Sequence, residues 1–283
     1  MVTKPFLHVF LPASLATDAQ DLRQKTLKVG VIGRVLGIFR VSEVVIFNDD
    51  DPNLKNQTAE AELLATLLRY METPQYLRKA LFKRTGELSY AGLLAPLRTP
   101  HHPLESEKTK PGDYREAVVI KVDEHGSLLE IGLHEKGFIK EKLRAGERFT
   151  VRLGKPLGDG KVAVTRAAKV EISEYWGYEV KLARSLADGL KEAKVNYVIG
   201  TSRHGQNLYE AASAIKSSNP SSAAVVFGGP YAGLFEICKR QRVDAKELFD
   251  VVVNTIPEQG VATVRTEEAL LATLALLNAL VWG

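Results

Sequence analysis

The sequence of 283 residues predicts an α/β domain with a mostly parallel sheet, interrupted by an inserted small β-barrel. Two patterns predict this organisation. Apolar strand-like runs alternate with helix-like segments at both ends of the chain, which is typical of a parallel sheet covered on both faces. Five short β-like runs separated by turn residues occupy the middle, and the OB-fold is the commonest barrel of that size.

The first α/β segment begins with an apolar strand at Phe6–Leu11, which ends at Pro12. Residues Asp18–Phe39 follow a helical period that glycines interrupt, and Glu43–Phe47 form a second strand. A polar loop then leads into a helix whose apolar stripe consists of Leu63, Leu64, Leu67, Leu68 and Met71.

The insert is expected to span residues 83–171, between α/β segments at residues 1–82 and 172–283. It carries 17 Lys and Arg residues against 13 Asp and Glu, while the rest of the chain has 21 of each. This excess positive charge is either an ordinary solvated surface or the sign of a polyanionic partner. The expected strands of the barrel are Ala117–Val122, Leu128–Leu133, Gly137–Ile139, Arg148–Leu153 and Val162–Arg166.

After the insert, a helix is expected over Ile172–Ala193, and the alternation of strands and helices resumes. The last apolar segment, Ala269–Trp282, is too short to span a bilayer and fits a buried helix. The remaining expected strands are Asn196–Ile199, Ala223–Phe227 and Asp250–Asn254.

Composition and motifs narrow the functional classes. A hydrophobic content of 45% and a charged content of 25% are those of an ordinary soluble globular protein. The single cysteine, Cys238, excludes an intramolecular disulfide framework and a cysteine-rich zinc site, and favours a reducing cytoplasm. The histidines lack metal-ligand spacing, so no metal is expected. No signal peptide is recognisable, so no membrane association is expected. No P-loop motif occurs, and the glycines of GVIGRVLG follow helical sequence, which argues against a Rossmann fingerprint.

Three polar, glycine-bearing loops follow the expected C-terminal strands: GTSRHGQ at 200–206, GGPYAG at 228–233 and TIPEQGVATV at 255–264. Ligands of open parallel sheets bind beyond the carboxyl ends of the strands. Each loop taken alone fits a simple turn. Because small residues let a backbone approach a ligand closely, the three together predict one wall of a ligand site.

The segment IPEQGVATVRTEEALLATLALL resembles the C-terminal signature of the SPOUT (α/β-knot) methyltransferases. GTSRHG, VVFGGPYAG and GVIGRVLGIFRVSEVVIFND are similar to further motifs of the branch that has a barrel inserted in the knot domain. That branch is associated with N3 methylation of uridine in large-subunit ribosomal RNA. The sequence departs from the pattern at Arg203 and His204, and at Gly33, before Arg34.

The resemblance implies a C-terminal trefoil knot whose loops hold S-adenosyl-L-methionine. It implies RNA as the partner, and the charge excess of the barrel predicts that the barrel docks on that RNA. It also implies a homodimer whose interface buries part of the last helix, with its Leu270, Leu271, Leu274, Leu277 and Leu280. The cofactor-binding residues that it implies are Thr201, Ser202, Gly228, Gly229, Pro230, Ile256, Gln259, Gly260, Val264 and Thr266.

Thr266, Arg34 and the chain as a whole each have more than one interpretation. Thr266 is also a good N-cap for the last helix, with Glu267 and Glu268 favourable in its first turn. Arg34 lies in an otherwise apolar helical segment, where an interface ion pair would explain it. The resemblance implies a different role, that of the family's functional arginine, contributed across a dimer to the partner's cofactor site. A non-catalytic RNA-binding protein that retains the fold is the alternative to the enzyme, and a small-molecule methyltransferase is a third possibility.

Overall fold

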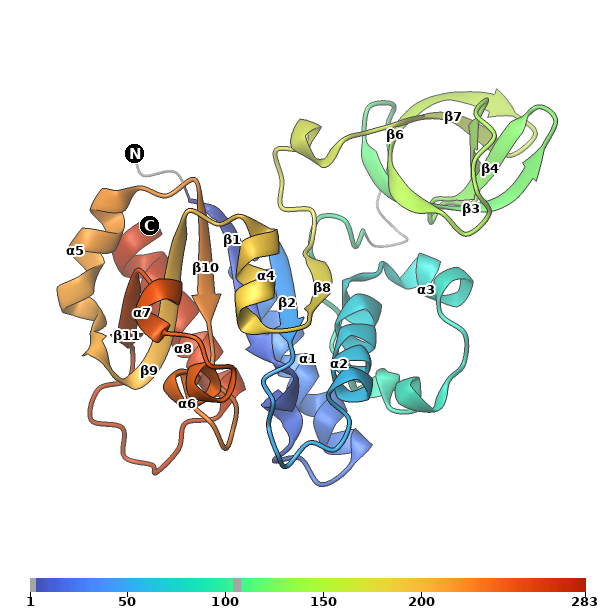
Figure 1. The fold of residues 1–283 in the computed structure, drawn as a ribbon. Coiled ribbons are helices and arrows are strands. Elements are labelled where there is room, and N and C mark those ends of the chain that lie inside the picture. Colours follow the sequence, from blue (N-terminus) through green and yellow to red (C-terminus); the bar gives the residue numbers. More distant parts are fainter. Residues whose placement is uncertain (1–3, 104–107) are drawn as a thin grey trace. The chain divides into compact units, whose positions relative to one another are not determined.

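The computed structural model describes residues 4–103 and 108–283, which form two compact units (Figure 1). The α/β unit comprises the described residues of the ranges 4–69, 87–95 and 178–283. The barrel unit comprises those of the ranges 70–86 and 96–177. Residues 104–107, which belong to the expected insert, lie outside the described residues.

The α/β unit is built on a six-stranded sheet over the described residues, in the order β11-β9-β10-β1-β2-β8. Every pair of neighbouring strands is parallel, and β1 lies between β10 and β2, with Val9 opposite Val225 and Val44. The predicted parallel sheet is therefore confirmed. Its strands are β1 (Phe6–Pro12), β2 (Glu43–Phe47), β8 (Glu179–Ala183), β9 (Tyr197–Asn207), β10 (Ser222–Val226) and β11 (Val251–Asn254).

Helices cover both faces of this sheet, with α4 and α6 on one face and α1 and α8 on the other (Figure 1). Local capping starts several of them, because side-chain oxygens of Asp21, Ser185 and Asn207 accept backbone N–H groups of α1, α4 and α5. The helices are α1 (Leu22–Ile38), α2 (Gln57–Glu72), α4 (Leu186–Ala193), α5 (Leu208–Ser218), α6 (Leu234–Arg240), α7 (Ala245–Leu248) and α8 (Thr266–Leu277), which continues as a π-helix over Asn278–Trp282.

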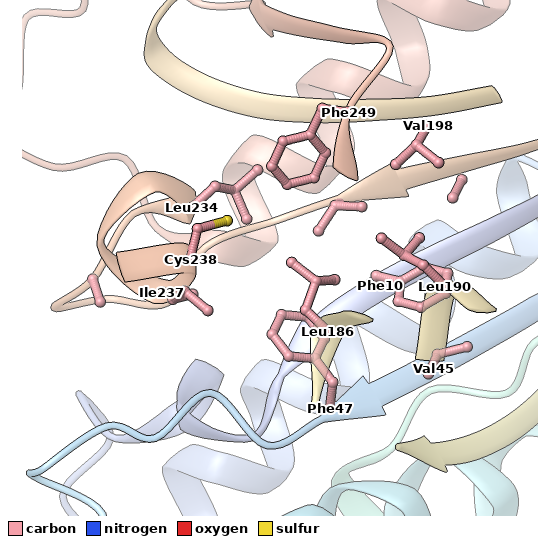
Figure 2. Close-up of a cluster of buried hydrophobic side chains, with 13 residues drawn as sticks. Phe10, Val45, Phe47, Leu186, Leu190, Val198, Leu234, Ile237, Cys238 and Phe249 are labelled. Carbon is pink, nitrogen blue, oxygen red and sulfur yellow. The ribbon is translucent and has the colours of Figure 1, made fainter. Parts of the chain in front are cut away.

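The core between the sheet and α4 and α6 is apolar and buried. Figure 2 shows Leu234, Ile237 and Cys238 of α6 directed toward side chains of the sheet and of α4. Burying a large aliphatic or aromatic side chain contributes about 1.5–3 kcal/mol, so this cluster holds α6, and the loop that precedes it, firmly on the sheet. No helix among the described residues has the length and apolar character that a bilayer-spanning segment needs.

The helix expected over Ile172–Ala193 is wrong in its first half. Gly177 has a φ of +81°, a conformation that interrupts a helix, and Glu179–Ala183 form strand β8. β8 pairs with the edge of β2, where Val180 lies opposite Val44. Residues Glu179–Ala183 therefore form a strand because they pair with β2, although their sequence follows a helical period. Of the expected helix, only Leu186–Ala193 are helical.

The barrel unit contains a closed barrel in the order β3-β4-β5-β7-β6, and the predicted five-stranded barrel is confirmed over the described residues. Antiparallel pairs form most of the wall, and a parallel pair of β5 and β7 closes it. Alternate side chains such as Val119, Leu129 and Val151 fill the interior. The strands are β3 (Tyr114–Asp123), β4 (Gly126–Glu130), β5 (Lys136–Ile139), β6 (Arg148–Gly158) and β7 (Lys161–Arg166).

Along the chain, the observed divisions between the two units differ from the expected boundaries at 82/83 and 171/172. Helix α3 (Gln75–Leu81) belongs to the barrel unit because it packs against β3. The Tyr76 hydroxyl donates to the carbonyl oxygen of Glu116 at 2.9 Å, and its ring lies against Gly132. The barrel unit thus begins near the end of α2.

A buried network of charged side chains joins the end of α2 to the barrel wall. The Arg148 guanidinium donates to the Glu72 carboxylate at 2.7 Å and to the Glu116 carboxylate at 2.7 Å. Burial would raise the pKa of Glu72, but the hydrogen bond with His101 and the charge of Arg148 outweigh it and lower the pKa to about 2. Burial, aided by the neighbouring His101, lowers the pKa of His102 to about 3.

Candidate functional site

The first wall of the site is a segment of β9 that leaves the sheet. β11 pairs with β9 so that Val252 lies opposite Gly200, but the next residue, Val253, lies opposite Gln206. Residues 201–205 therefore project from the ladder at the carboxyl end of the strand. A Cβ on Gly205 would lie 2.6 Å from the carbonyl carbon of Val253, so only glycine lets the projecting segment return so close to β11.

The second wall follows β10 and depends on two glycines. The Gly229 N–H donates to the carbonyl oxygen of Ala232 at 2.8 Å, which closes a tight turn. A Cβ on Gly228 would lie 2.9 Å from that same oxygen, and a Cβ on Gly229 would lie 2.5 Å from the Ser14 hydroxyl. Ser14 is itself held by the buried carboxylate of Asp49, to which its hydroxyl donates at 2.6 Å.

The third wall is the long loop between β11 and α8, and side chains tie it to the first. The Asn254 amide donates to the carbonyl oxygen of Arg203 at 3.0 Å, and the Arg203 guanidinium donates to the carbonyl oxygen of Ala262 at 3.0 Å. The Gln259 amide donates to the carbonyl oxygens of Val261 and Ala262 at 2.8 and 3.3 Å. These bonds hold a loop that has no regular structure of its own.

The start of α8 joins the third wall to the second. The Thr266 hydroxyl donates to the carbonyl oxygen of Gly228 at 3.2 Å, and the side chain is buried. Thr266 is the first residue of the helix, with Arg265 at the N-cap position, so the interpretation of Thr266 as the N-cap is wrong. Its hydroxyl bonds across the fold instead of capping its own helix.

The three loops enclose a cavity of about 450 Å³ at the carboxyl ends of β9, β10 and β11. The predicted convergence of the three loops is thus what the structure shows. Gly260 does not line the cavity, and neither does Arg34. The cavity is lined by the other residues singled out in the sequence, namely Thr201, Ser202, Gly228, Gly229, Pro230, Ile256, Gln259, Val264 and Thr266.

Several lining residues were not predicted. Arg203 and His204 were noted only as departures from a pattern, although Arg203 forms the tie to Ala262. Tyr231 and Phe235 line the cavity with 59% and 44% of their surface exposed. Nothing in the sequence marks these aromatics as unburied, except that Phe235 falls on the polar side of a short helix whose other side is apolar.

Arg34 lies on α1, half-buried, in a stripe of exposed apolar residues. Leu27, Val31 and Ile38 are 45%, 47% and 55% exposed, and their spacing along the helix places them and Arg34 on one face. Leu271 of α8, which packs against α1, is 44% exposed. Leu270, Leu274 and Leu277 are fully buried within their own chain, so less of α8 is left uncovered than its composition predicts.

Comparisons with known proteins agree with these features. Residues 7–277 match the sequence profile of a family described as "Putative RNA methyltransferase". The 28S rRNA (uridine-N(3))-methyltransferase of Homo sapiens is 36% identical over 300 residues, which cover 96% of this chain and 77% of that protein. The protein of the same name from Mus musculus is 35% identical, covering 96% of this chain and 76% of that protein.

A solved structure also aligns with nearly the whole chain. It is that of the SpoU methyltransferase AviRb from Streptomyces viridochromogenes in complex with AdoMet, which covers 98% of this chain and 62% of its own. The identity is 9% and the TM-score is 0.33, a similarity too low to establish a shared fold.

Proposed function

The chain belongs to this family of RNA methyltransferases, and from that premise we propose that it methylates N3 of a uridine in large-subunit ribosomal RNA. The relatives named for this reaction match 96% of the chain, so both the α/β unit and the barrel unit take part in the similarity. The observation that carries the proposal is the cavity, where three loops converge at the carboxyl ends of parallel strands.

The cavity fits S-adenosylmethionine as the cofactor. Its volume of about 450 Å³ is that of a small-molecule site. Gly228 and Gly229 of the second wall leave room for a cofactor to approach the backbone closely, and Thr201 and Ser202 of the first wall supply hydroxyl groups. The cofactor, when bound, supplies a methyl group activated on a sulfonium. In this proposal the loop after β11 forms the trefoil knot of the SPOUT fold, with the Thr266–Gly228 bond holding its end.

The residues of the protein must then prepare the uracil. N3 carries a weakly acidic proton, which must leave to solvent as the N3–methyl bond forms and the sulfonium becomes a thioether, and polarisation of the ring eases that loss. A cation near the resulting oxyanion stabilises it by electrostatic preorganisation. We assign this role to Arg34. Because Arg34 does not line the cavity of its own chain, the proposal requires that a second copy of the chain supply it.

The proposed homodimer follows from the exposed stripe on α1. Leu27, Val31 and Ile38 form one exposed apolar face of α1, and Leu271 is an exposed apolar residue of α8, the helix that packs against α1. A face of this kind is normally covered by another surface. Burying it against a second copy would place Arg34, which lies within the stripe, at the boundary between the subunits.

The barrel unit is proposed as the part that docks on RNA. It contains 19 Lys and Arg residues against 14 Asp and Glu, whereas the remainder of the chain contains 19 against 20. A local excess of positive charge attracts a polyanion, and affinity that depends on it falls as salt is added because counterions are released. The excess does not lie on the unit that holds the cavity, so docking and catalysis are assigned to different parts of the chain.

Filling the cavity tests the proposal. Ala269 lines it from the first turn of α8, so Ala269→Phe should occupy the cavity and abolish both S-adenosylhomocysteine binding in calorimetry and methyl transfer to a ribosomal RNA transcript. Ala59→Phe, at an exposed position of α2, is the matched control and should change neither. A wild-type protein that binds RNA but neither the cofactor nor its product would instead be the non-catalytic RNA-binding protein.

A further inference from the structure

Tyr231 and Phe235 stand on the rim of the cavity, and the proposed cofactor does not account for them. Both line the cavity, yet 59% of Tyr231 and 44% of Phe235 remain exposed. Gly228, Gly229 and Thr266, by contrast, are half-buried or buried. The lining therefore passes from enclosed backbone and hydroxyl groups to two exposed aromatic side chains.

The fold fixes the position of these aromatics. In α6, Leu234, Ile237 and Cys238 point into the core, as Figure 2 shows, and Phe235 lies at the edge of that face, where 44% of it is exposed. Tyr231 follows Pro230 in the turn that the Gly229–Ala232 hydrogen bond closes. Single exposed apolar residues are ordinary on protein surfaces. Tyr231 and Phe235 differ from such residues, because the turn closed by the Gly229–Ala232 bond and helix α6 hold both of them at the mouth of one cavity.

We infer that Tyr231 and Phe235 form the surface on which the uracil to be methylated stacks, an inference that rests on the proposed function. An enzyme that modifies a base must take it out of its stack. Unstacked bases of RNA are held on the faces of aromatic side chains. A ring at the rim would hold the base beside a cofactor bound farther inside, with the base still joined to an RNA strand outside.

The charges at the rim suit a nucleotide. Arg203 and His204 lie on the β9 side of the cavity, and the Arg203 guanidinium brings a positive charge there. The Glu236 carboxylate, beside Phe235, lies 3.8 Å from the Arg240 guanidinium, which also lies 3.6 Å from the buried Asp51 carboxylate. The cation that a phosphate next to the stacked base would meet is therefore Arg203, on the β9 side of the cavity.

Aromatic substitutions separate base stacking from cofactor binding. In Tyr231→Ala and Phe235→Ala, KM for a large-subunit ribosomal RNA transcript should rise about tenfold or more, the usual effect of losing one stacked aromatic. Affinity for S-adenosylhomocysteine should stay within about twofold of wild type, because the glycine loops are intact. Tyr231→Phe, which keeps the ring, should keep the wild-type KM. Tyr209→Ala, at a residue that is 66% exposed and does not line the cavity, is the control.

A cross-linking experiment locates the base directly and needs no turnover. A uridine decamer that contains 4-thiouridine should cross-link to the segment 231–235 of the wild-type protein, and the double alanine variant should lose that cross-link. A cross-link that persists elsewhere, an unchanged KM, or a parallel loss of cofactor-product affinity would overturn the inference. Absence of methyl transfer by the wild-type protein would contradict the proposed function. The cross-link would still show whether a uracil base binds at Tyr231 and Phe235.

Discussion

At the scale of single residues, substituting Arg34 distinguishes a catalytic role for this residue from a structural one. If it stabilises the oxyanion, Arg34→Ala should slow single-turnover methylation by about 10²–10³, the usual cost of losing one preorganised donor. Melting temperature and dimer mass should remain near wild type. Arg34→Lys should rescue only part of the rate, because an ammonium group cannot reproduce a planar guanidinium. Arg23→Ala, an exposed change on the same helix, is the control.

The opposite pattern would identify Arg34 as an interface ion pair. Breaking a buried pair costs about 3–5 kcal/mol, so melting temperature or dimer mass would then fall together with activity. A stable, dimeric and fully active Arg34→Ala protein would contradict both roles.

Also at the residue scale, His102 and Glu72 should make the barrel unit sensitive to acid. In the folded chain the pKa of His102 is lowered to about 3, whereas an unfolded histidine takes up a proton near pH 6.5. Unfolding therefore binds a proton below about pH 6.5, and stability should fall as pH drops from there toward 3. The Glu72 carboxylate, with its pKa lowered from 4.5 to about 2, should cause a further loss of stability between those values.

Replacing one side chain isolates the first of these effects. His102→Gln keeps an N–H that can donate to the Glu72 carbonyl oxygen, as the imidazole does at 2.6 Å, but it cannot titrate. Its melting temperature should change less between pH 7 and pH 5 than that of the wild type. His125→Gln, on an exposed side chain, should keep the wild-type slope. An unchanged slope in His102→Gln would show that His102 is not the acid-sensitive group.

At the scale of elements, replacement by alanine should destabilise the protein at Gly205 but not at Gly260. A Cβ on Gly205 would lie 2.6 Å from the β11 backbone, so Gly205→Ala should cost about 1–3 kcal/mol of unfolding free energy and weaken product binding. Nothing lies within 4 Å of a Cβ on Gly260, so Gly260→Ala should leave the melting temperature unchanged. Calorimetry of Gly260→Ala then tests its predicted part in cofactor binding. Equal melting curves for both variants would contradict the packing argument.

The same elements show what a sequence can predict. β1, β2 and β10 are mostly apolar, because buried parallel strands face the core on both sides, and they were predicted within a residue or two of their ends. The polar exceptions in β1 and β2, His8 and Glu43, are buried and pair with each other. β8 was missed because its residues read locally as helix, and only pairing with β2 makes it a strand. The three site loops were located because each follows a predictable strand. The Arg203–Ala262 bond was not, because it depends on the path of the long loop.

At the scale of the whole molecule, the presence of an inserted barrel was predictable but its boundaries were not. Short strands and turn residues mark the barrel in the sequence. The boundary depends on α3, whose Tyr76 bonds to β3, and on the ion network that Glu72 forms with Arg148. Both are contacts between segments far apart in the sequence. A helical period alone does not show which unit a helix packs against.

The proposed dimer makes a prediction about the whole assembly. Light scattering should give the wild type twice the 31.1 kDa mass of one chain. Val31→Glu places a charge in the exposed stripe of α1, so it should yield single chains that keep their fold and lose methyl transfer. Leu157→Glu, a matched change at a 54% exposed residue of the barrel, should remain dimeric. A wild-type protein that is monomeric at micromolar concentration and fully active would contradict the dimer.

Mixing two inactive variants would show whether Arg34 acts across that dimer. Arg34→Ala leaves the cavity intact, and Ala269→Phe fills the cavity but leaves Arg34 in place. In a heterodimer of the two, one open cavity meets one native Arg34 from the other chain. Random exchange of subunits between equal amounts should make half of the dimers mixed, with one working site of two, and restore about a quarter of wild-type activity. If Arg34 served the cavity of its own chain, every site in the mixture would lack one of the two features, and no activity would return.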